Sequence, residues 1–200
     1  MTVPAILTSI HGKQLGLGPK GRLIVGAAGT NMNQGVASVV AYTNEAASTA
    51  ISNTVTETLF STQYSIPPNS LAPGMRIKIR FQGIAPATNA TDTLAVKLYI
   101  GGLTGTALIS MAATDVANND VFTGEYELVV RTIGATGTIV GVGTFKSIPA
   151  AEGTATYKDD ILASTTIDTT AAKVIGVSAT WSVANAGNSV RLDILSVEIA

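Results

Sequence analysis

The sequence predicts an all-β fold: an antiparallel β-sandwich, jelly-roll-like, of about eight strands with an extended N-terminal arm. Three observations support this prediction. From about residue 54 onward, apolar and polar residues alternate with a period close to two, as in strands with one face in a core and one in water. Turn-forming segments separate these stretches. No convincing helical segment lies between them, which favours a sandwich over a parallel α/β sheet.

The clearest predicted strand covers residues 75–81. Its apolar and cationic residues alternate, so the two sets are expected on opposite faces of a sheet. The apolar set is Met75, Ile77, Ile79 and Phe81, and the cationic set is Arg76, Lys78 and Arg80.

Seven further strands are predicted, at 56–66, 93–102, 105–112, 121–132, 138–148, 173–183 and 189–199. In the second of these, Lys97 and Tyr99 are expected to point outward. In the last, Val190, Leu192 and Ile194 share a face, whereas Val197 and Ile199 have the opposite parity. A bulge near Leu195 would reconcile the two halves.

These strands assign residues 54–200 to the sandwich and residues 1–53 to the arm. The arm mixes Gly and Asn with short apolar pieces, and it offers too little apolar surface for a core of its own. Within it, apolar residues between Val36 and Ile51 fall near helical spacing, but their β-branched content argues against a helix.

The composition excludes several classes of site. The chain has no cysteine and one histidine, His11, so disulfides, thiol nucleophiles and thiolate zinc sites are excluded. No apolar run reaches the roughly 18 residues of a membrane helix. No dense Lys/Arg cluster marks a nucleic-acid surface. Residues 1–100 carry seven basic and three acidic residues, whereas residues 101–200 carry five basic and ten acidic residues. A head-to-tail or layered contact between chains could use this asymmetry, or it could reflect uneven scatter of solvated charges.

The stretch GLGPKG at 16–21 matches the glycine pattern of a dinucleotide-binding loop. Such a loop must open a helix, whose N-terminus binds the pyrophosphate. Here the following residues, RLIVG, read as a strand. The glycines therefore predict the tip of a hairpin or an extended bend, with Leu15, Leu17, Leu23 and Val25 as its apolar residues.

The remaining polar candidates favour structural roles. His11 has no carboxylate near it in the sequence, so an interface or solvent position is expected. Asp159 and Asp160, with Asp168 nearby, could bind a hard cation, but they lack calcium-loop spacing and indicate a solvated turn. Glu125 and Glu127 could form a glycosidase pair, yet they lie on an expected solvent face. The one tryptophan, Trp181, has the parity of a core residue. No metal or cofactor is predicted, and the chain is not expected to be an enzyme.

Four stretches resemble virion structural proteins of tailed bacteriophages. Three belong to the predicted sandwich and resemble the β-rich domain of these proteins: ATNATDTLAVKLYIGG, DVANNDVFTGEYELVVRTIGATGT and LASTTIDTTAAKVIGVSATWSVANAGNSVRLDILSVEI. The fourth, IHGKQLGLGPKGRLIV, resembles the opening of phage head decoration and fibre-like proteins.

The resemblance implies a capsid cement or decoration protein on the virion surface. Such a protein binds the major capsid protein and itself, as a homo-oligomer, with a trimer expected. It acts on no small-molecule substrate and needs no membrane and no direct contact with nucleic acid. The residues expected to contact partners are Leu15, Leu17, Leu23, Ile24 and Val25 in the arm, and Arg76, Lys78 and Arg80 on the sheet. The alternative is a receptor- or glycan-binding module of a phage head fibre or tail.

Overall fold

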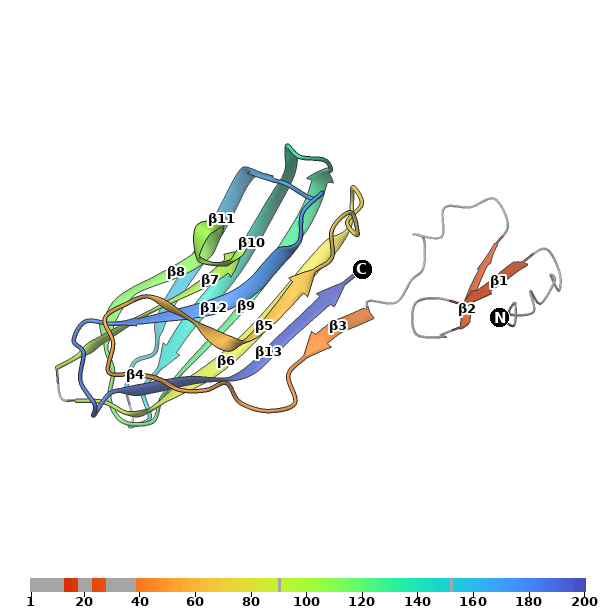
Figure 1. Cartoon of the computed structure of the whole chain (residues 1–200). Coiled ribbons are helices and arrows are strands. Elements are labelled where there is room, and N and C mark those ends of the chain that lie inside the picture. Colours follow the sequence, from red (N-terminus) through yellow and green to blue (C-terminus); the bar gives the residue numbers. More distant parts are fainter. Residues whose placement is uncertain (1–12, 18–22, 28–38, 90, 152) are drawn as a thin grey trace. The chain divides into compact units, whose positions relative to one another are not determined.

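The computed structural model describes residues 13–17, 23–27, 39–89, 91–151 and 153–200. It divides the chain into two compact units, Met1–Ser38 and Val39–Ala200 (Figure 1). In the first unit, β1 (Lys13–Leu17) and β2 (Leu23–Ala27) pair as an antiparallel hairpin. In the described part of the chain, no helix has the length and apolar character needed to cross a membrane.

The second unit is a sandwich of two antiparallel sheets. One sheet has seven strands, in the order β11-β10-β9-β6-β13-β3 with β4 also paired to β13, and the other has four, in the order β5-β12-β7-β8. The strands are β3 (Val39–Thr43), β4 (Ile51–Ser52), β5 (Thr58–Ile66), β6 (Arg76–Ala87), β7 (Thr93–Ile100), β8 (Thr106–Asp115), β9 (Asp120–Thr132), β10 (Gly137–Ile148), β11 (Thr156–Ile167), β12 (Lys173–Trp181) and β13 (Ser189–Ile199), and one short 3-10 helix, η1 (Gly102–Thr104), follows β7.

The strands pair in a nested order that gives a jelly roll. β3 and β4 pair with β13, β5 with β12, β6 with β9, and β7 with β8. Pairing of first with last and second with second-last is what two nested Greek keys produce. In the sequence, the hairpin of β10 and β11 is inserted between β9 and β12, and in space it extends the seven-stranded sheet beyond β9. The predicted all-β sandwich is therefore confirmed.

All eight predicted strands are present, but the structure has three that were not predicted: β3, β4 and β11. Because β3 and β4 pair with β13, residues 39–53 belong to the sandwich. The predicted boundary between residues 53 and 54 is wrong, because the chain divides into its two units between Ser38 and Val39. The first strand of the jelly roll is short and interrupted, which hid its alternation. Within the stretch of helical spacing, residues 39–51 form no helix, and residues 36–38 lie outside the described residues.

The core lies between the two sheets and uses glycine opposite aromatic rings. Gly124 lies opposite Phe81 across the β6 and β9 ladder, and Gly143 lies opposite Tyr126 across β9 and β10. At each of these glycines an added methyl group would overlap the facing ring. The rings therefore occupy the space that a glycine Cβ would need, and the glycines are required for packing. Trp181 is 1% exposed, as predicted for a core residue.

The alternation in β13 changes parity at a bulge, as predicted, although the bulge precedes Leu195. The register with β6 shifts between Leu192 and Ile194. Leu192 and Leu195 are both fully buried, while Ile194 is 42% exposed, so the prediction that Ile194 points inward is wrong. The extra residue moves Ile194 to the outer face and returns Leu195 to the core.

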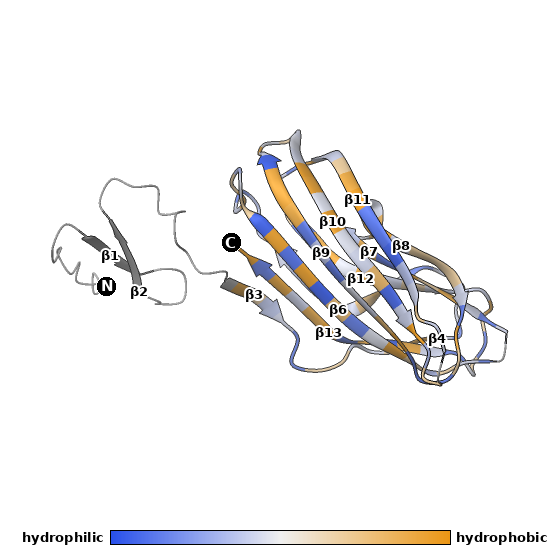
Figure 2. Ribbon diagram, turned by 180° about the vertical axis from the view of Figure 1, so that it is seen from behind, coloured by the Kyte–Doolittle hydropathy of each residue, from blue (hydrophilic) through white to orange (hydrophobic). Residues whose placement is uncertain are grey.

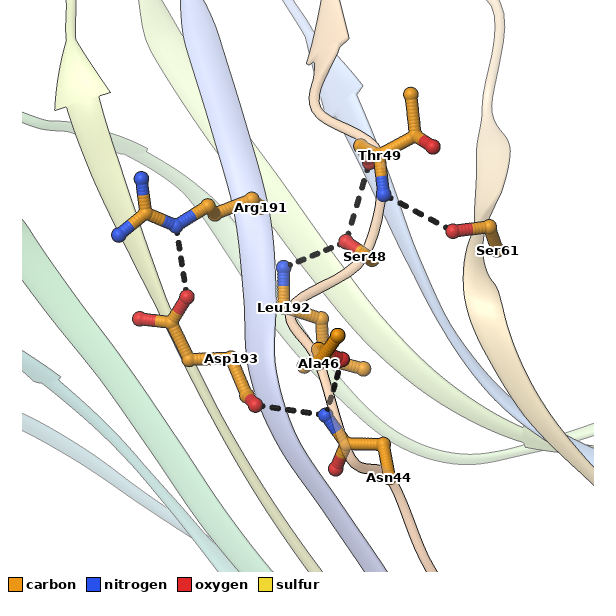
Figure 3. A network of polar contacts seen from close by, with 8 residues as sticks. All are labelled: Asn44, Ala46, Ser48, Thr49, Ser61, Arg191, Leu192 and Asp193. Atoms are coloured by element: carbon orange, nitrogen blue, oxygen red, sulfur yellow. Dashed lines mark hydrogen bonds and ion pairs between the residues drawn. The ribbon is translucent and has the colours of Figure 1, made fainter.

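Asn44 holds this bulge from the neighbouring segment (Figure 3). Its Nδ2 donates to the carbonyls of Asp193 at 2.7 Å and Ala46 at 2.8 Å, and its Oδ1 accepts from the backbone N–H of Leu195 at 2.7 Å. Ser48 and Thr49 follow it along the chain. The Ser48 hydroxyl accepts from the N–H of Leu192, and the Thr49 N–H donates to the Ser61 hydroxyl on β5. Residues 44–49 therefore link β13 in one sheet to β5 in the other.

Candidate functional site

The five predicted arm residues all lie in the β1 and β2 hairpin. The register pairs Leu15 with Val25 and Leu17 with Leu23, so these four positions share one face of the hairpin, and Ile24, opposite Gly16, falls on the other. Residues 18–22, which include Gly18 and Gly21, lie outside the described residues, as does His11. The segment after Gly21 forms a strand rather than a helix, so the GLGPKG stretch does not have the architecture of a dinucleotide-binding loop.

The predicted cationic stripe lies on β6, on the outer face of the seven-stranded sheet (Figure 2). Arg76, Lys78 and Arg80 are exposed and alternate with buried residues, as expected. Arg80 forms an ion pair with Glu125 at 3.1 Å, and Arg76 forms one with Glu127 at 3.5 Å.

This stripe is one half of a pattern of two columns of opposite charge. In the ladder of β6 and β9, Arg80 lies opposite Glu125, and Lys78 lies opposite Glu127. The side chains of Arg80 and Glu125 are 63% and 64% exposed, so water screens their attraction. Such exposed pairs each add at most about 1 kcal/mol to stability. The face therefore presents a basic column beside an acidic one, and both remain available to a partner.

Apolar side chains flank the charged columns on the same face. Val142 and Ile161 lie opposite each other on β10 and β11 and are 55% and 79% exposed. At the other side of the sheet, Val40 on β3 is 55% exposed and lies opposite Glu198 on β13. Tyr157, on β11, is also exposed and lies under the ammonium of Lys146, 5.1 Å from its ring centroid.

A shallow hollow of about 240 Å³ lies where the columns meet β10. The side chains at its rim include Lys78, Arg80, Glu125, Glu127 and Val142. Gly143 lies beneath it, with Tyr126 packed from the inside. The phenol of Tyr126 is 2% exposed, and burial, followed by the nearby charge of Asp160, raises its pKa to about 12. The hollow therefore offers mixed charge and apolar contact, and the Tyr126 phenol beneath it stays protonated near neutral pH.

The outer face of the four-stranded sheet carries a different polar cluster, centred on Glu57. One carboxylate oxygen accepts from the hydroxyls of Ser178 at 2.7 Å and Tyr99 at 3.0 Å, and the other accepts from the Lys97 ammonium at 3.0 Å. Ser178 is 1% exposed and Tyr99 is 7% exposed, so Tyr99 points to the outer face of the sheet as predicted but is shielded from water there. Glu57 covers it.

These hydrogen bonds set the titration of the cluster. Partial burial raises the pKa of Glu57, but the hydrogen bonds from Ser178, Lys97 and Tyr99 together outweigh it, so the pKa lies below its ordinary value. The hydrogen bond to Glu57 raises the pKa of Lys97. Ser178 is too buried to meet a substrate, and its hydroxyl donates to a carboxylate whose lowered pKa makes it a weak base. The cluster therefore anchors the segment before β5 to the sheet.

A second hollow, of about 440 Å³, lies at one end of the sandwich and is lined by Thr88, Asp115, Val116, Ala117, Asn118 and Asp120. Its carboxylate at Asp120 already accepts the backbone N–H groups of Ala117 and Ala150, each at 2.8 Å. The Asn118 side chain accepts the N–H of Thr88 at 2.7 Å. These polar groups are used to join loops.

Asp159 and Asp160 lie within β11, so the predicted turn at these residues is wrong. Asp160 forms an ion pair with Lys158 at 3.5 Å. Within the described ranges, no group of three or more His, Cys, Asp or Glu side chains could hold a metal ion. Lys158 also donates to the carbonyl of Ser110 on β8 at 2.6 Å and so joins the two sheets at this side.

No protein-family model and no curated protein matches the sequence. Among solved structures, a chain in the structure of infectious bursal disease virus Gx strain has 14% identity and a TM-score of 0.38 over 98% of this chain, which spans only 36% of that chain. The CBM2 module of the evolved Dit of Lactobacillus casei BL23 phage J-1 has 14% identity and a TM-score of 0.34, covering 68% of this chain and 67% of that one. Both scores are low, so neither likeness bears on what this chain binds.

Sequence reasoning placed the cations correctly but missed their partners and the Glu57 cluster. A signal for the first was present, because RIKIR at 76–80 and EYE at 125–127 carry opposite charges at the same two-residue spacing. That match favours pairing of these two segments, which the structure shows to be antiparallel. Glu57 gave no such signal, since its three partners come from strands far apart in the sequence.

Proposed function

We propose that this chain is a structural protein of a bacteriophage particle, a cement or decoration protein that binds the outside of the capsid shell and stabilises it. The resemblance of its sequence to phage virion proteins supports the class. The jelly-roll body with a separate small N-terminal unit supports the mode of action, since adhesion requires contact area and no catalytic cluster.

The observation that carries the proposal is the N-terminal hairpin. A two-stranded hairpin is at best marginally stable alone in water. Four of its positions on one face are Leu15, Leu17, Leu23 and Val25. This hairpin gains stability when that face is covered, and the major capsid protein is the partner proposed to cover it. Ordering on binding then has a cost, which the buried apolar surface offsets.

Oligomerisation would strengthen attachment without stronger individual contacts. When one arm of an oligomer is bound, the next arm binds at a high effective concentration, so weak contacts suffice. The sandwich then holds the arms of the oligomer together, and the outer face of the seven-stranded sheet is the surface proposed for contacts between copies.

The test uses capsids lacking the protein and full-length variants. Leu15→Lys with Leu23→Lys should abolish binding in a sedimentation assay, whereas Gln14→Lys, which changes a position on the opposite face, should bind normally. Removal of residues 1–38 should also abolish binding and leave the Trp181 fluorescence of the folded body unchanged. Normal capsid binding by the double-leucine variant would contradict the proposal.

The alternative, a glycan-binding module, has one observation in its favour. Tyr157 is 65% exposed on a sheet face, and an exposed aromatic ring is the usual platform for a sugar. Binding of host polysaccharide that is lost in Tyr157→Ala and retained in the hairpin variants would support this function.

A further inference from the structure

The outer face of the seven-stranded sheet is self-complementary: its side chains match those of the same face on a second copy of the chain. Its strands are ordered β11-β10-β9-β6-β13-β3, so β9 and β6 are the central pair. We propose that this face binds the same face of a second copy of the chain, about a two-fold axis that runs along the strands between β6 and β9. This pairing concerns the isolated protein and goes beyond the proposed attachment to capsids.

Charge complementarity is the first argument. A two-fold axis between the columns places β6 of one copy over β9 of the other, with the rows of the ladder preserved. Arg80 then faces Glu125 of the second copy, and Lys78 faces Glu127 of the second copy. Each contact occurs twice. A basic column next to an acidic one is therefore complementary to its own copy in this orientation, whereas a face of a single sign would repel itself.

Two apolar pairs follow the same symmetry, whereas Val142 of one copy falls opposite Glu198 of the other. One row of the sheet runs from Ile161 through Val142, Glu127, Lys78 and Glu198 to Val40. The axis through its centre places Ile161 of one copy opposite Val40 of the other. These side chains are 79% and 55% exposed. In another row Val121 and Ile84 lie opposite each other on β9 and β6, so the axis places each against the other's copy.

The size of the face is sufficient. Six strands at about 4.8 Å spacing, over about eight residues of ~3.3 Å each, give roughly 760 Å² per copy. The total of roughly 1,500 Å² is within the standard range for a stable protein interface.

Two of the sheet edges, β11 and β8, are less suited to self-association. β11 carries Lys158, Asp159 and Asp160 along its length, and its register with β10 shifts between Ile139 and Gly141. β8 has two register shifts, and Lys158 covers the carbonyl of Ser110 on it. Charges and bulges of this kind prevent strands of separate molecules from pairing at an edge.

The expected result for the full chain is a mass of two chains by light scattering, and dissociation as salt concentration rises. The trimer that the sequence resemblance implies would give three chains and would overturn the two-fold pair, as would a monomer at high protein concentration in low salt.

Two charge-reversed variants give a sharper test. An acidic-face variant carries Arg76→Glu, Lys78→Glu and Arg80→Glu, and a basic-face variant carries Glu125→Lys and Glu127→Lys. Each should be monomeric alone, because like charges face each other across the axis. A one-to-one mixture should restore the mass of a pair. Association of either variant alone, or failure of the mixture to associate, would contradict the proposal.

Because the variants with several charge reversals could misfold, a variant with one exposed substitution provides an independent test. Ile161→Lys alters a side chain that is 79% exposed, so folding is unaffected, and the dissociation constant of the pair should rise about tenfold or more. Lys173→Glu, on β12 in the other sheet, is the matched control and should leave the constant unchanged. An unchanged constant for Ile161→Lys would overturn the assigned orientation. None of these positions lies in the N-terminal hairpin, so a failed pairing and a failed capsid attachment are distinguishable.

Discussion

The outer faces of the two sheets place similar charged groups in different surroundings. On the four-stranded sheet, Glu57 lies among Lys97, Tyr99 and Ser178, and the two hydroxyl-bearing residues are almost fully buried. On the seven-stranded sheet, Glu125 meets Arg80 with both side chains mostly in water.

The difference separates charges that hold the fold from charges that are available to a partner. A carboxylate with buried hydrogen-bond donors cannot be removed without leaving those donors unsatisfied. An exposed ion pair can be removed with little effect on folding, because water replaces each partner. The added hairpin of β10 and β11 widens only the second face, which is where the exposed apolar residues Val142 and Ile161 lie.

The largest effect is expected from the inner side of the seven-stranded sheet, directly beneath its tolerant outer face. Gly143→Ala would force a methyl group into the Tyr126 ring and should lower the free energy of unfolding by about 3 kcal/mol. Thr144→Ala, one residue along on the exposed outer face, should change it by less than about 0.5 kcal/mol. Urea unfolding followed by Trp181 fluorescence measures both, and equal effects would mean that the two faces are not distinguished by packing.

Removal of the carboxylate from the four-stranded face should have the next largest effect. Glu57→Ala leaves the buried Ser178 hydroxyl without its acceptor, so the free energy of unfolding should fall by about 1–3 kcal/mol. Glu57→Gln retains an acceptor and should lose less. The same urea titration applies, and a Glu57→Ala variant as stable as the parent would show that the cluster does not anchor the segment.

Acid should weaken the four-stranded face selectively. Because the folded-state pKa of Glu57 is lowered from its ordinary 4.5, its stabilising contribution is present above that value and is lost as the pH falls through the folded pKa. The stability difference between the parent and Glu57→Gln should therefore shrink as the pH falls from 7 to 3. The raised pKa of Lys97 acts at the other extreme, and its contribution is lost as the pH rises beyond 10.5 through the folded pKa. Parallel pH profiles for the two proteins would exclude this role for Glu57.

The smallest effect on stability is expected from the exposed ion pair. Arg80→Ala should change the free energy of unfolding by less than about 1 kcal/mol when measured at a dilution where the chain is monomeric. A loss as large as that of Glu57→Ala would mean that both faces serve folding and would remove the distinction between them.

The sequence predicted the fold where strands are long and have one face in the core. β6, β9 and β7 show this alternation, and their turns contain Pro, Asn and Gly. β11 was missed because it lies at a sheet edge: many of its residues are exposed, and its alternation is weak. β3 and β4 were missed because they are short and separated by a segment without strand alternation, in which Asn44 and Ser48 bond to β13 through their side chains as well as their backbone N–H groups.

The candidate site was predicted in part for a related reason. Alternation within one strand places Arg76, Lys78 and Arg80 on a face, but it does not say which strand lies beside them. The neighbouring strand is determined by the pairing of β6 with β9. These two strands are separated by β7 and β8 in the sequence but are adjacent in the sheet.

The interrupted first strand has a mechanical consequence. Any tension transmitted from residues 1–38 enters the sandwich at Val39, where β3 pairs with the end of β13. The hydrogen bonds of the short β3 ladder can break one after another. The next residue, Asn44, is bonded to β13 through both the Nδ2 and the Oδ1 of its side-chain amide. In a pulling experiment, Asn44 should act as the stop that determines the rupture force, and Asn44→Ala should let the body unravel under a weaker pull.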